Sequence, residues 1–214
     1  MKYAGMPMGM WVLFGGSFRK HLSLVYGYDP ETAKAIAAKA KPKYKEIIDR
    51  LPEFEKADRF KTNFVNCAML SSFLLSLPER PTVEKATAYY RASMMTTPMK
   101  WFCRMSGKKK FTENCFDQKE IDKYVRGAER SKKRAYPMDW VFDFSYDLSV
   151  PEYDVTHREC GVCKIGQQEN LTFLTPHMCV MDYPTIEYKG GKLLRTKTLG
   201  AGGDCCDFHV VKGA

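Results

Sequence analysis

The chain has 214 residues, of which 44% are hydrophobic and 28% are charged. This length and composition exclude a disordered protein and a pair of ordinary large domains, and they favour one folded domain over residues 1–214. The formal net charge is +9, but the basic residues are spread along the chain rather than set in a recognisable nucleic-acid-binding module. We therefore expect no nucleic-acid partner, and the charge suits either solubility or attraction of a small carboxylated substrate.

The sequence also bears on location. Residues 10–18 form the only candidate export signal, but this apolar run is short and Arg19, Lys20 and His21 follow it at once. No stretch approaches the roughly 18–20 uncharged residues that a membrane-spanning helix needs. Eight cysteines without an export signal favour a reducing compartment. We therefore expect a cytoplasmic protein with no membrane partner, and a homo-oligomer stays open.

Residues 1–136 carry a mostly helical pattern. Asp29 is a predicted N-cap with Pro30 at the first helical position, and the helix that they open extends to about Leu51. A wide apolar stripe at three-and-four spacing predicts a central buried helix over residues 58–77. Further helices are predicted over residues 82–95, 97–105 and 117–130, the first and last capped by Thr82 and Asp117.

The pattern changes after Pro137, where β-branched and aromatic residues alternate with polar ones. Strands are predicted over residues 140–146, 153–159, 192–199 and 206–211, with a helix over residues 176–188. The expected fold class is α+β. Its N-terminal helical layer, residues 1–136, packs on a mainly antiparallel sheet of about four strands in residues 137–214.

Thiols are concentrated in the same final third, which holds five of the eight cysteines and three of the four histidines. A thiol attacks only as the thiolate, and its pKa falls near positive charge or hydrogen-bond donors. Gly202 and Gly203 leave room for backbone amides to approach a ligand and stabilise negative charge just before Cys206. Cys206 is therefore the predicted nucleophile, expected to be accessible at a pocket, with a buried core role as the alternative.

Carboxylates and an imidazole accompany this thiol. Asp207 alternates to the opposite face of a regular strand, so it shares a site with Cys206 only if the strand begins with a bulge. Cys179 and Asp182 lie three residues apart on the predicted helix and therefore share one face. The alternatives are that Asp182 pairs with a basic residue at the surface and that His177 caps the helix.

Arg195 and Lys197 share one face of the third predicted strand, and the guanidinium of Arg195 suits a substrate carboxylate, whereas Lys197 is expected at the surface. The run Cys160-Gly-Val-Cys163 occupies a strand-to-helix turn. With Cys205 or Cys206 it could offer thiolates to zinc, but adjacent cysteines suit one tetrahedral ion poorly. A thioredoxin-type disulfide is typical of a βαβ setting, which the pattern lacks. We expect no metal and no cofactor.

Three segments carry a resemblance to a known family: Tyr153–Cys160, Leu174–Tyr183 and Arg195–Phe208. Read together they resemble the L-2-amino-thiazoline-4-carboxylic acid hydrolase family, and the glycine pair followed after a short gap by Cys-Asp-Phe is the specific part. The resemblance covers roughly residues 150–210. It implies hydrolysis of a small carboxylated heterocycle, with Cys160 as a second thiol facing the pocket. Cys163 and Cys205 depart from the family pattern.

Pattern and resemblance together predict a cysteine-dependent hydrolase that opens an aminothiazoline-like or amide-like substrate, by thiolate attack or through an activated water. The predicted catalytic residues are Cys206, Asp207, Asp182 and His177. The predicted substrate-binding residues are Cys160, Cys179, Arg195, Gly202 and Gly203. The alternative function is a non-catalytic thiol or metal-binding domain that senses a small ligand.

Overall fold

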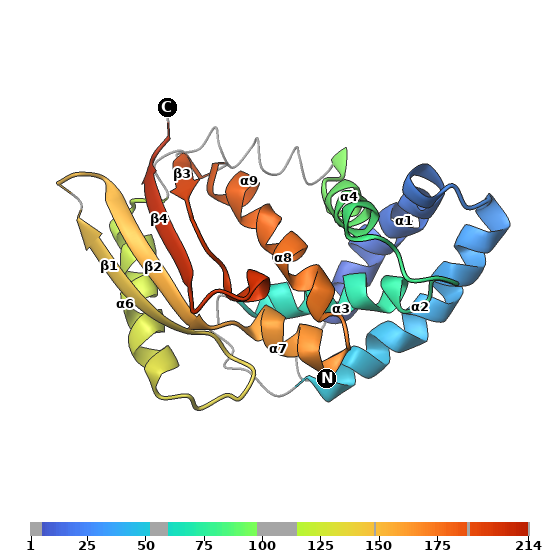
Figure 1. The fold of residues 1–214 in the computed structure, drawn as a ribbon, viewed down its shortest axis with the longest axis horizontal. Helices are drawn as coiled ribbons and strands as arrows, with labels where there is room; N and C mark the ends of the chain where they lie inside the picture. The colour runs from blue at the N-terminus through green and yellow to red at the C-terminus, as the bar shows by residue number, and fades with distance from the viewer. Residues whose placement is uncertain (1–5, 52–59, 98–114, 148, 188, 214) are drawn as a thin grey trace. The chain divides into compact units, whose positions relative to one another are not determined.

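The computed structural model describes residues 6–51, 60–97, 115–147, 149–187 and 189–213 (Figure 1). The chain divides into two compact units. One consists of Met1–Thr97 and Ile165–Leu174, and the other consists of Pro98–Lys164 and Thr175–Ala214. The predicted α+β class is confirmed, with helices in the N-terminal part and a four-stranded antiparallel sheet in the C-terminal part. That residues 1–214 form one domain stays a prediction.

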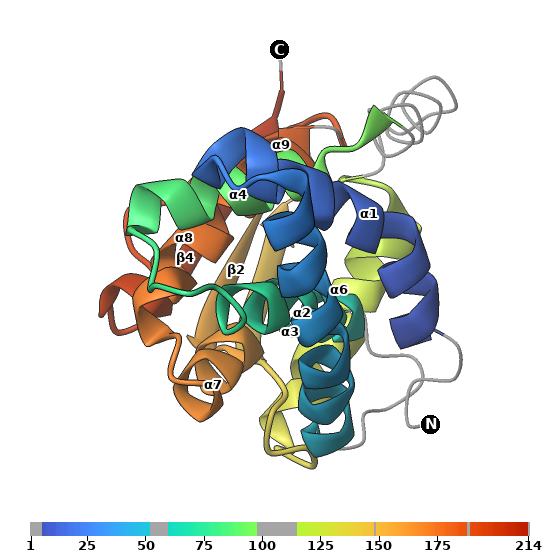
Figure 2. The same ribbon diagram turned by 90° about the vertical axis from the view of Figure 1, so that its right-hand side faces the viewer.

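The first unit is helical. Its long helices are α1 (Met6–Tyr26), α2 (Pro30–Arg50), α3 (Lys61–Leu74) and α4 (Val83–Met94). Figure 2 shows α1 beside α4 and α2 beside α3. The predicted start of α2 is confirmed, because the Asp29 carboxylate accepts hydrogen bonds from the backbone of Glu31 and Thr32 at 3.0 Å each. Thr82 caps α4 as predicted.

Aromatic rings form the core of this unit. The Phe18 ring lies 5.1 Å from that of Phe73 and 5.5 Å from that of Tyr89, between ring centroids, and all three side chains are fully buried. The Tyr89 hydroxyl donates to the Phe18 carbonyl at 3.0 Å, which satisfies this buried polar group. Phe73 belongs to α3, which is the buried helix that the apolar stripe predicts.

Helix α1 was not predicted. Its glycines lower helix propensity, so the local pattern favours no helix there. Gly15 is nevertheless suited to its position, because a Cβ at this residue would lie 3.3 Å from the indole of Trp11. The predicted helix over residues 97–105 lies outside the described residues, apart from Thr97.

The second unit contains the sheet. Its strands are β1 (Val141–Asp147), β2 (Glu152–Glu159), β3 (Gly191–Leu194) and β4 (Cys206–Lys212). They lie in the order β1-β2-β4-β3 and every neighbouring pair is antiparallel (Figure 1). Helix α6 (Gln118–Lys132) follows its predicted N-cap, since the Asp117 carboxylate accepts from the Lys119 backbone at 2.8 Å. β3 is shorter than predicted.

The two faces of the sheet differ in chemistry. On one face, Tyr124 of α6 stacks on Phe144 with ring centroids 4.9 Å apart and contacts the ring of Tyr153 at 5.5 Å. On the opposite face, His209 pairs with Asp154 at 2.9 Å, and both side chains are exposed or half-exposed. Successive residues of a strand point to opposite faces, so this division decides which β4 side chains are buried.

The predicted helix over residues 176–188 is instead three short pieces: α8 (Thr175–Met178), the 3-10 turn η3 (Cys179–Met181) and α9 (Asp182–Glu187). Pro184 lies in the first turn of α9, where its missing N–H has no partner within the helix. Tyr188 lies outside the described residues.

The remaining elements are α7 (Gly161–Gln168) and the 3-10 turns η2 (Thr172–Leu174) and η4 (Leu199–Ala201). Within the described ranges, no helix combines the length and apolar character needed to cross a membrane.

Candidate functional site

Four cysteines gather in the second unit, at the start of α7, in η3 and at the start of β4: Cys160, Cys163, Cys179 and Cys206. We call them the thiol cluster. They lie close enough for the charge of one to affect the pKa of others, and Asp182 and Arg195 act on the same group of thiols. Three residue types that support nucleophilic chemistry therefore share one place: thiols, a carboxylate and a guanidinium.

Cys160 occupies the N-cap position of α7. β2 ends at Glu159, and the Cys160 carbonyl accepts the first helical hydrogen bond from the Lys164 backbone at 3.1 Å. Three hydrogen-bond donors surround the Cys160 sulfur: the Cys163 thiol and the backbone N–H groups of Cys163 and Val162. These three donors lower the pKa of Cys160 although the residue is partly buried. The same interaction with Cys160 disfavours loss of the thiol proton of Cys163, so the pKa of Cys163 is raised.

Lys164 fixes this turn to the end of β2. Its ammonium group donates to Glu159 Oε2 at 2.7 Å and to the carbonyls of Pro137 and Asp139 at 2.9 Å each. Glu159 also accepts from Arg134 Nε at 2.8 Å. The position of Cys160 thus depends on a network of charge-assisted hydrogen bonds. The sequence analysis missed Lys164, because nothing in the local pattern distinguishes it from a surface lysine.

Cys206 lies on the buried face of the sheet. It pairs with His157 in the β2–β4 register and is 4% exposed, so the expectation that it is accessible is wrong. Its sulfur accepts from the Leu199 backbone N–H at 3.2 Å. Burial nevertheless dominates and raises the pKa of Cys206 to about 11. The thiol form therefore prevails at neutral pH.

Arg195 and Asp182 form an ion pair beside the thiols. Arg195 Nη1 lies 2.8 Å from Asp182 Oδ2, and Nη2 donates to the Cys179 carbonyl at 3.1 Å. The guanidinium also lies over the rings of Tyr183 and Phe208, 4.9 and 5.0 Å from their centroids. The Arg195 side chain is only 6% exposed, so two of its five N–H donors are committed in a confined place.

The carboxyl group of Asp182 and the thiol of Cys179 differ in protonation state. Burial raises the pKa of Asp182 to about 6, and the attraction of Arg195 opposes this shift without cancelling it. The side chain keeps 39% of its surface exposed, so water can still reach it. Cys179 donates its thiol to the Thr175 carbonyl at 3.4 Å, and burial raises its pKa to about 12. Asp182 is therefore the group of this pair that titrates near neutral pH.

Asp207 lies apart from the thiol cluster. The β2–β4 register is regular from Cys206 onward, so no bulge turns Asp207 toward the buried face. Its carboxylate accepts from the backbone N–H groups of Thr196 and Lys197 at 3.1 and 2.8 Å, and from the Thr196 hydroxyl. Burial alone would raise the pKa of Asp207, but these hydrogen bonds outweigh it and the pKa is lowered. The bonds also draw the chain out of β3, which ends at Leu194.

The glycine turn is shaped by its own backbone. The N–H of Gly202 donates to the Leu199 carbonyl at 3.1 Å, and that of Gly203 donates to the Thr198 carbonyl at 2.9 Å. Gly202 adopts a φ of 87°, and a Cβ at Gly203 would lie 3.0 Å from the Thr198 oxygen. Both amides are thus committed within the loop, so their predicted contact with substrate stays a prediction. His177 lies half-buried on α8, and no hydrogen bond of its side chain is found among the described residues.

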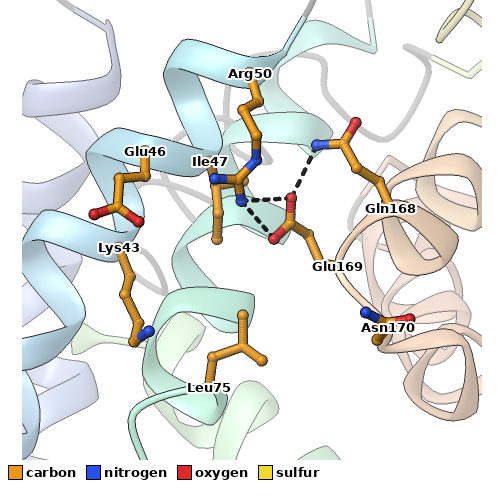
Figure 3. A pocket seen from close by; sticks show the side chains of 8 residues that line it. All are labelled: Lys43, Glu46, Ile47, Arg50, Leu75, Gln168, Glu169 and Asn170. Atoms are coloured by element: carbon orange, nitrogen blue, oxygen red, sulfur yellow. Dashed lines mark hydrogen bonds and ion pairs between the residues drawn. The ribbon is translucent and has the colours of Figure 1, made fainter.

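A separate cavity lies in the first unit (Figure 3). Its volume is about 260 Å³. Arg50 Nη2 donates to both carboxylate oxygens of Glu169, at 2.8 and 2.7 Å, and Leu75 and Lys43 face the same space. The residues that line it include no thiol, and its most buried carboxylate is already paired. We therefore place the candidate site at the thiol cluster.

Within the described ranges, no group of three or more His, Cys, Asp or Glu side chains is arranged to hold a metal ion.

Comparison with known proteins gives one match. The sequence model of the L-2-amino-thiazoline-4-carboxylic acid hydrolase family matches residues 68–210, a stretch that includes the whole thiol cluster, Asp182 and Arg195. Neither a curated protein nor a solved structure matched the chain. The family match covers well over half of the sequence, and the family name indicates a hydrolase. The chain belongs to the L-2-amino-thiazoline-4-carboxylic acid hydrolase family.

Proposed function

We propose that this hydrolase opens a small carboxylated heterocycle of the aminothiazoline class, with a thiolate of the thiol cluster as nucleophile. The observation that carries the proposal is the meeting of Cys160, with its three hydrogen-bond donors, and the Asp182–Arg195 pair in one unit of a family member. The donors supply the ionised sulfur, the guanidinium suits the substrate carboxylate, and Asp182 suits proton transfer.

We assign the attack to Cys160 rather than to Cys206, which the sequence analysis favoured. Cys160 accepts hydrogen bonds from donors at a helix N-terminus, which stabilise its thiolate. Cys206 is buried, accepts one backbone hydrogen bond, and has its pKa raised to about 11. At neutral pH the population of thiolate therefore favours Cys160.

The chemistry balances as follows. The Cys160 thiolate adds to the carbon between the ring nitrogen and the ring sulfur, and the tetrahedral adduct collapses by breaking the bond from this carbon to the ring sulfur. The ring sulfur takes up a proton from solvent and becomes the free thiol of the opened substrate. The former ring carbon stays bonded to Cys160 as an isothiourea. Water then adds to the same carbon, and the bond to Cys160 breaks. The product carries a urea and a free thiol.

Asp182 and Arg195 have separate roles in this scheme. With a pKa of about 6, Asp182 is mostly ionised at pH 7 and can accept a proton from the attacking water. Arg195 retains donors beyond those used on Asp182 and the Cys179 carbonyl, and these can bind the substrate carboxylate. Asp207 then acts as a positioning residue through the turn that follows Arg195.

Single cysteine variants test the assignment with 2-aminothiazoline-4-carboxylate as substrate and chromatographic detection of the opened product. We expect Cys160→Ser to lower kcat by about 1,000-fold or more, and Cys206→Ser to lower it by less than about 10-fold. Cys205→Ser is the matched control, because Cys205 is adjacent to Cys206 but outside the thiol cluster, and it should retain wild-type turnover. The reverse order for Cys160 and Cys206 would restore Cys206 as nucleophile. A wild-type protein inactive on every aminothiazoline would remove the substrate class and leave the family assignment.

A further inference from the structure

Cys160 and Cys163 are one helical turn apart, and each affects the pKa of the other. Cys160 is the N-cap of α7 and Cys163 lies in its first turn, where Cα atoms three residues apart are about 5 Å from each other. The Cys163 thiol lies within reach of the Cys160 sulfur as a hydrogen-bond donor. Disulfides span Cα separations of about 4.4–6.8 Å, so this pair needs little backbone movement to form one.

The pair also differs from Cys206 in exposure. Cys160 and Cys163 are partly exposed, whereas Cys205 and Cys206 are buried. Cys179, although partly exposed, points its thiol at the Thr175 carbonyl. A soluble disulfide can therefore reach the two sulfurs at the start of α7 more readily than the buried ones.

The two sulfurs have complementary states. Cys160 accepts three hydrogen bonds, which favour the thiolate that attacks a disulfide. Cys163 is the donor toward Cys160, and its raised pKa keeps it protonated at neutral pH. A thiolate with a neighbouring thiol is the arrangement that thiol–disulfide exchange requires, here at a strand-to-helix turn outside any βαβ unit.

We propose that Cys160 and Cys163 are a modification site, at which a low-molecular-weight disulfide of the glutathione type oxidises the pair to an internal disulfide. The Cys160 thiolate attacks one sulfur of the small disulfide, forms a mixed disulfide and releases the first small thiolate. Cys163 then loses its proton to that thiolate and attacks the Cys160 sulfur, which expels the second small thiolate. Two protein sulfurs are oxidised and one small disulfide is reduced to two small thiols.

The inference deepens the proposed function and rests on it in one respect: oxidation removes the thiolate to which we assign the attack, so the disulfide form is inactive in ring opening. Formation of the disulfide itself does not depend on the substrate or on the hydrolase reaction. The two proposals can therefore fail separately.

The test uses the full chain, first reduced and then incubated with excess glutathione disulfide. Alkylation at low pH stops the exchange, and intact mass and tryptic peptides are then recorded. We expect a product that carries two alkyl groups fewer than the alkylated reduced chain and is lighter by about 2 Da more, the two hydrogens lost on disulfide formation. Trypsin cuts after Arg158 and Lys164, so one peptide, Glu159–Lys164, contains both cysteines and no other. The disulfide should lie within this peptide.

Variants separate the two steps. Cys163→Ser and Cys163→Ala should stop at the mixed disulfide and retain one glutathione on Cys160, and two different replacements guard against a folding defect in either. Cys179→Ser is the matched control and should still form the internal disulfide. Failure of excess glutathione disulfide to oxidise the peptide, a disulfide that includes Cys179 or Cys206, or absence of the mixed disulfide in both Cys163 variants would overturn the proposal.

Activity distinguishes this proposal from the proposed function. If the oxidised chain forms the internal disulfide and loses ring opening, which dithiothreitol restores, both stand. If the disulfide forms but the oxidised chain opens the ring as fast as the reduced chain does, the modification site stands and the assignment of attack to Cys160 is wrong.

Discussion

At the scale of single residues, the interaction of Cys163 with Cys160 lowers the pKa of Cys160 and raises that of Cys163. Its donor comes from a residue that departs from the family pattern, so the sequence analysis placed Cys163 outside the site. The structure instead brings it into contact with Cys160, where its proton lowers the pKa of Cys160. A serine in place of Cys163 keeps an O–H donor, and an alanine removes it.

This difference gives the first residue-scale prediction. Cys163→Ala should raise the pKa of Cys160 and slow its reaction with iodoacetamide at pH 7 several-fold, whereas Cys163→Ser should stay close to wild type. Labelling followed through the Glu159–Lys164 peptide measures both rates. Equal rates in the two variants would mean that the Cys163 side chain does not support the thiolate.

Asp182 gives the second prediction for a single residue. Its pKa of about 6 is raised by burial, so below pH 6 the carboxyl is protonated and cannot accept a proton from water. We expect kcat to fall as the pH drops through 6. Asp182→Asn should abolish that limb and lower the plateau by about 100-fold to 10,000-fold. Asp204→Asn is the control, because Asp204 is exposed and pairs with Lys197 at 2.6 Å; it should retain the wild-type pH profile. A wild-type profile that is flat through pH 6 would exclude Asp182 as the base.

The raised pKa of Asp182 also makes the folding stability depend on pH. The pKa of Asp182 is higher in the folded protein than the value of 3.8 in the unfolded chain, so the folded state binds this proton more tightly. Its contribution to folding is full below pH 4 and is lost as the pH rises through 6. The ion pair with Arg195 reduces this loss but does not reverse it.

At the scale of elements, the sequence predicts best what local chemistry decides. The starts of α2, α4 and α6 follow from Asp29, Thr82 and Asp117, because an N-cap side chain bonds to backbone groups only a few residues away. The end of β3 depends instead on Asp207, which bonds to backbone groups 10 and 11 residues earlier in the chain. No local pattern contains that information.

The candidate site likewise combines features that local sequence predicts with features that only the tertiary structure decides. Period-two alternation correctly required a bulge for Cys206 and Asp207 to share a face, but only the β2–β4 register reveals that none is present. The spacing of Cys179 and Asp182 predicts their proximity, and both act on the thiol cluster. That Cys160 rather than Cys206 is the better-supported thiolate depends on burial and on the N-cap position, which tertiary structure determines.

The bonds of Asp207 lead to the element-scale prediction. Asp207→Ala should loosen the turn that follows Arg195 and lower kcat/KM by about 10–100-fold, mainly through a higher KM, because substrate binding depends on the placement of Arg195. Asp154→Ala is the control, since Asp154 lies on the same exposed face of the sheet and pairs with His209. It should leave both constants unchanged. A fall in kcat with an unchanged KM would return Asp207 to a catalytic role.

At the scale of the whole molecule, one of the three points at which the chain passes from one compact unit to the other falls inside α7, between Lys164 and Ile165. Unfolding of either unit would break this helix, so we predict that residues 1–214 unfold as one cooperative domain. Native-state hydrogen exchange in rising urea tests this. Protection of α3 and of β2 should converge on the same free energy of opening. Loss of protection in one unit at clearly lower urea would establish two domains.

The proposed mechanism requires Cys160 as the attacking sulfur, and trapping the covalent intermediate tests this assignment. The reduced chain is mixed with 2-aminothiazoline-4-carboxylate, quenched in acid within the first turnover, digested and analysed by mass spectrometry. We predict a covalent substrate adduct on the Glu159–Lys164 peptide, located at Cys160 and absent from Cys160→Ser. An adduct located at Cys206 instead, or full turnover by Cys160→Ser, would contradict the account.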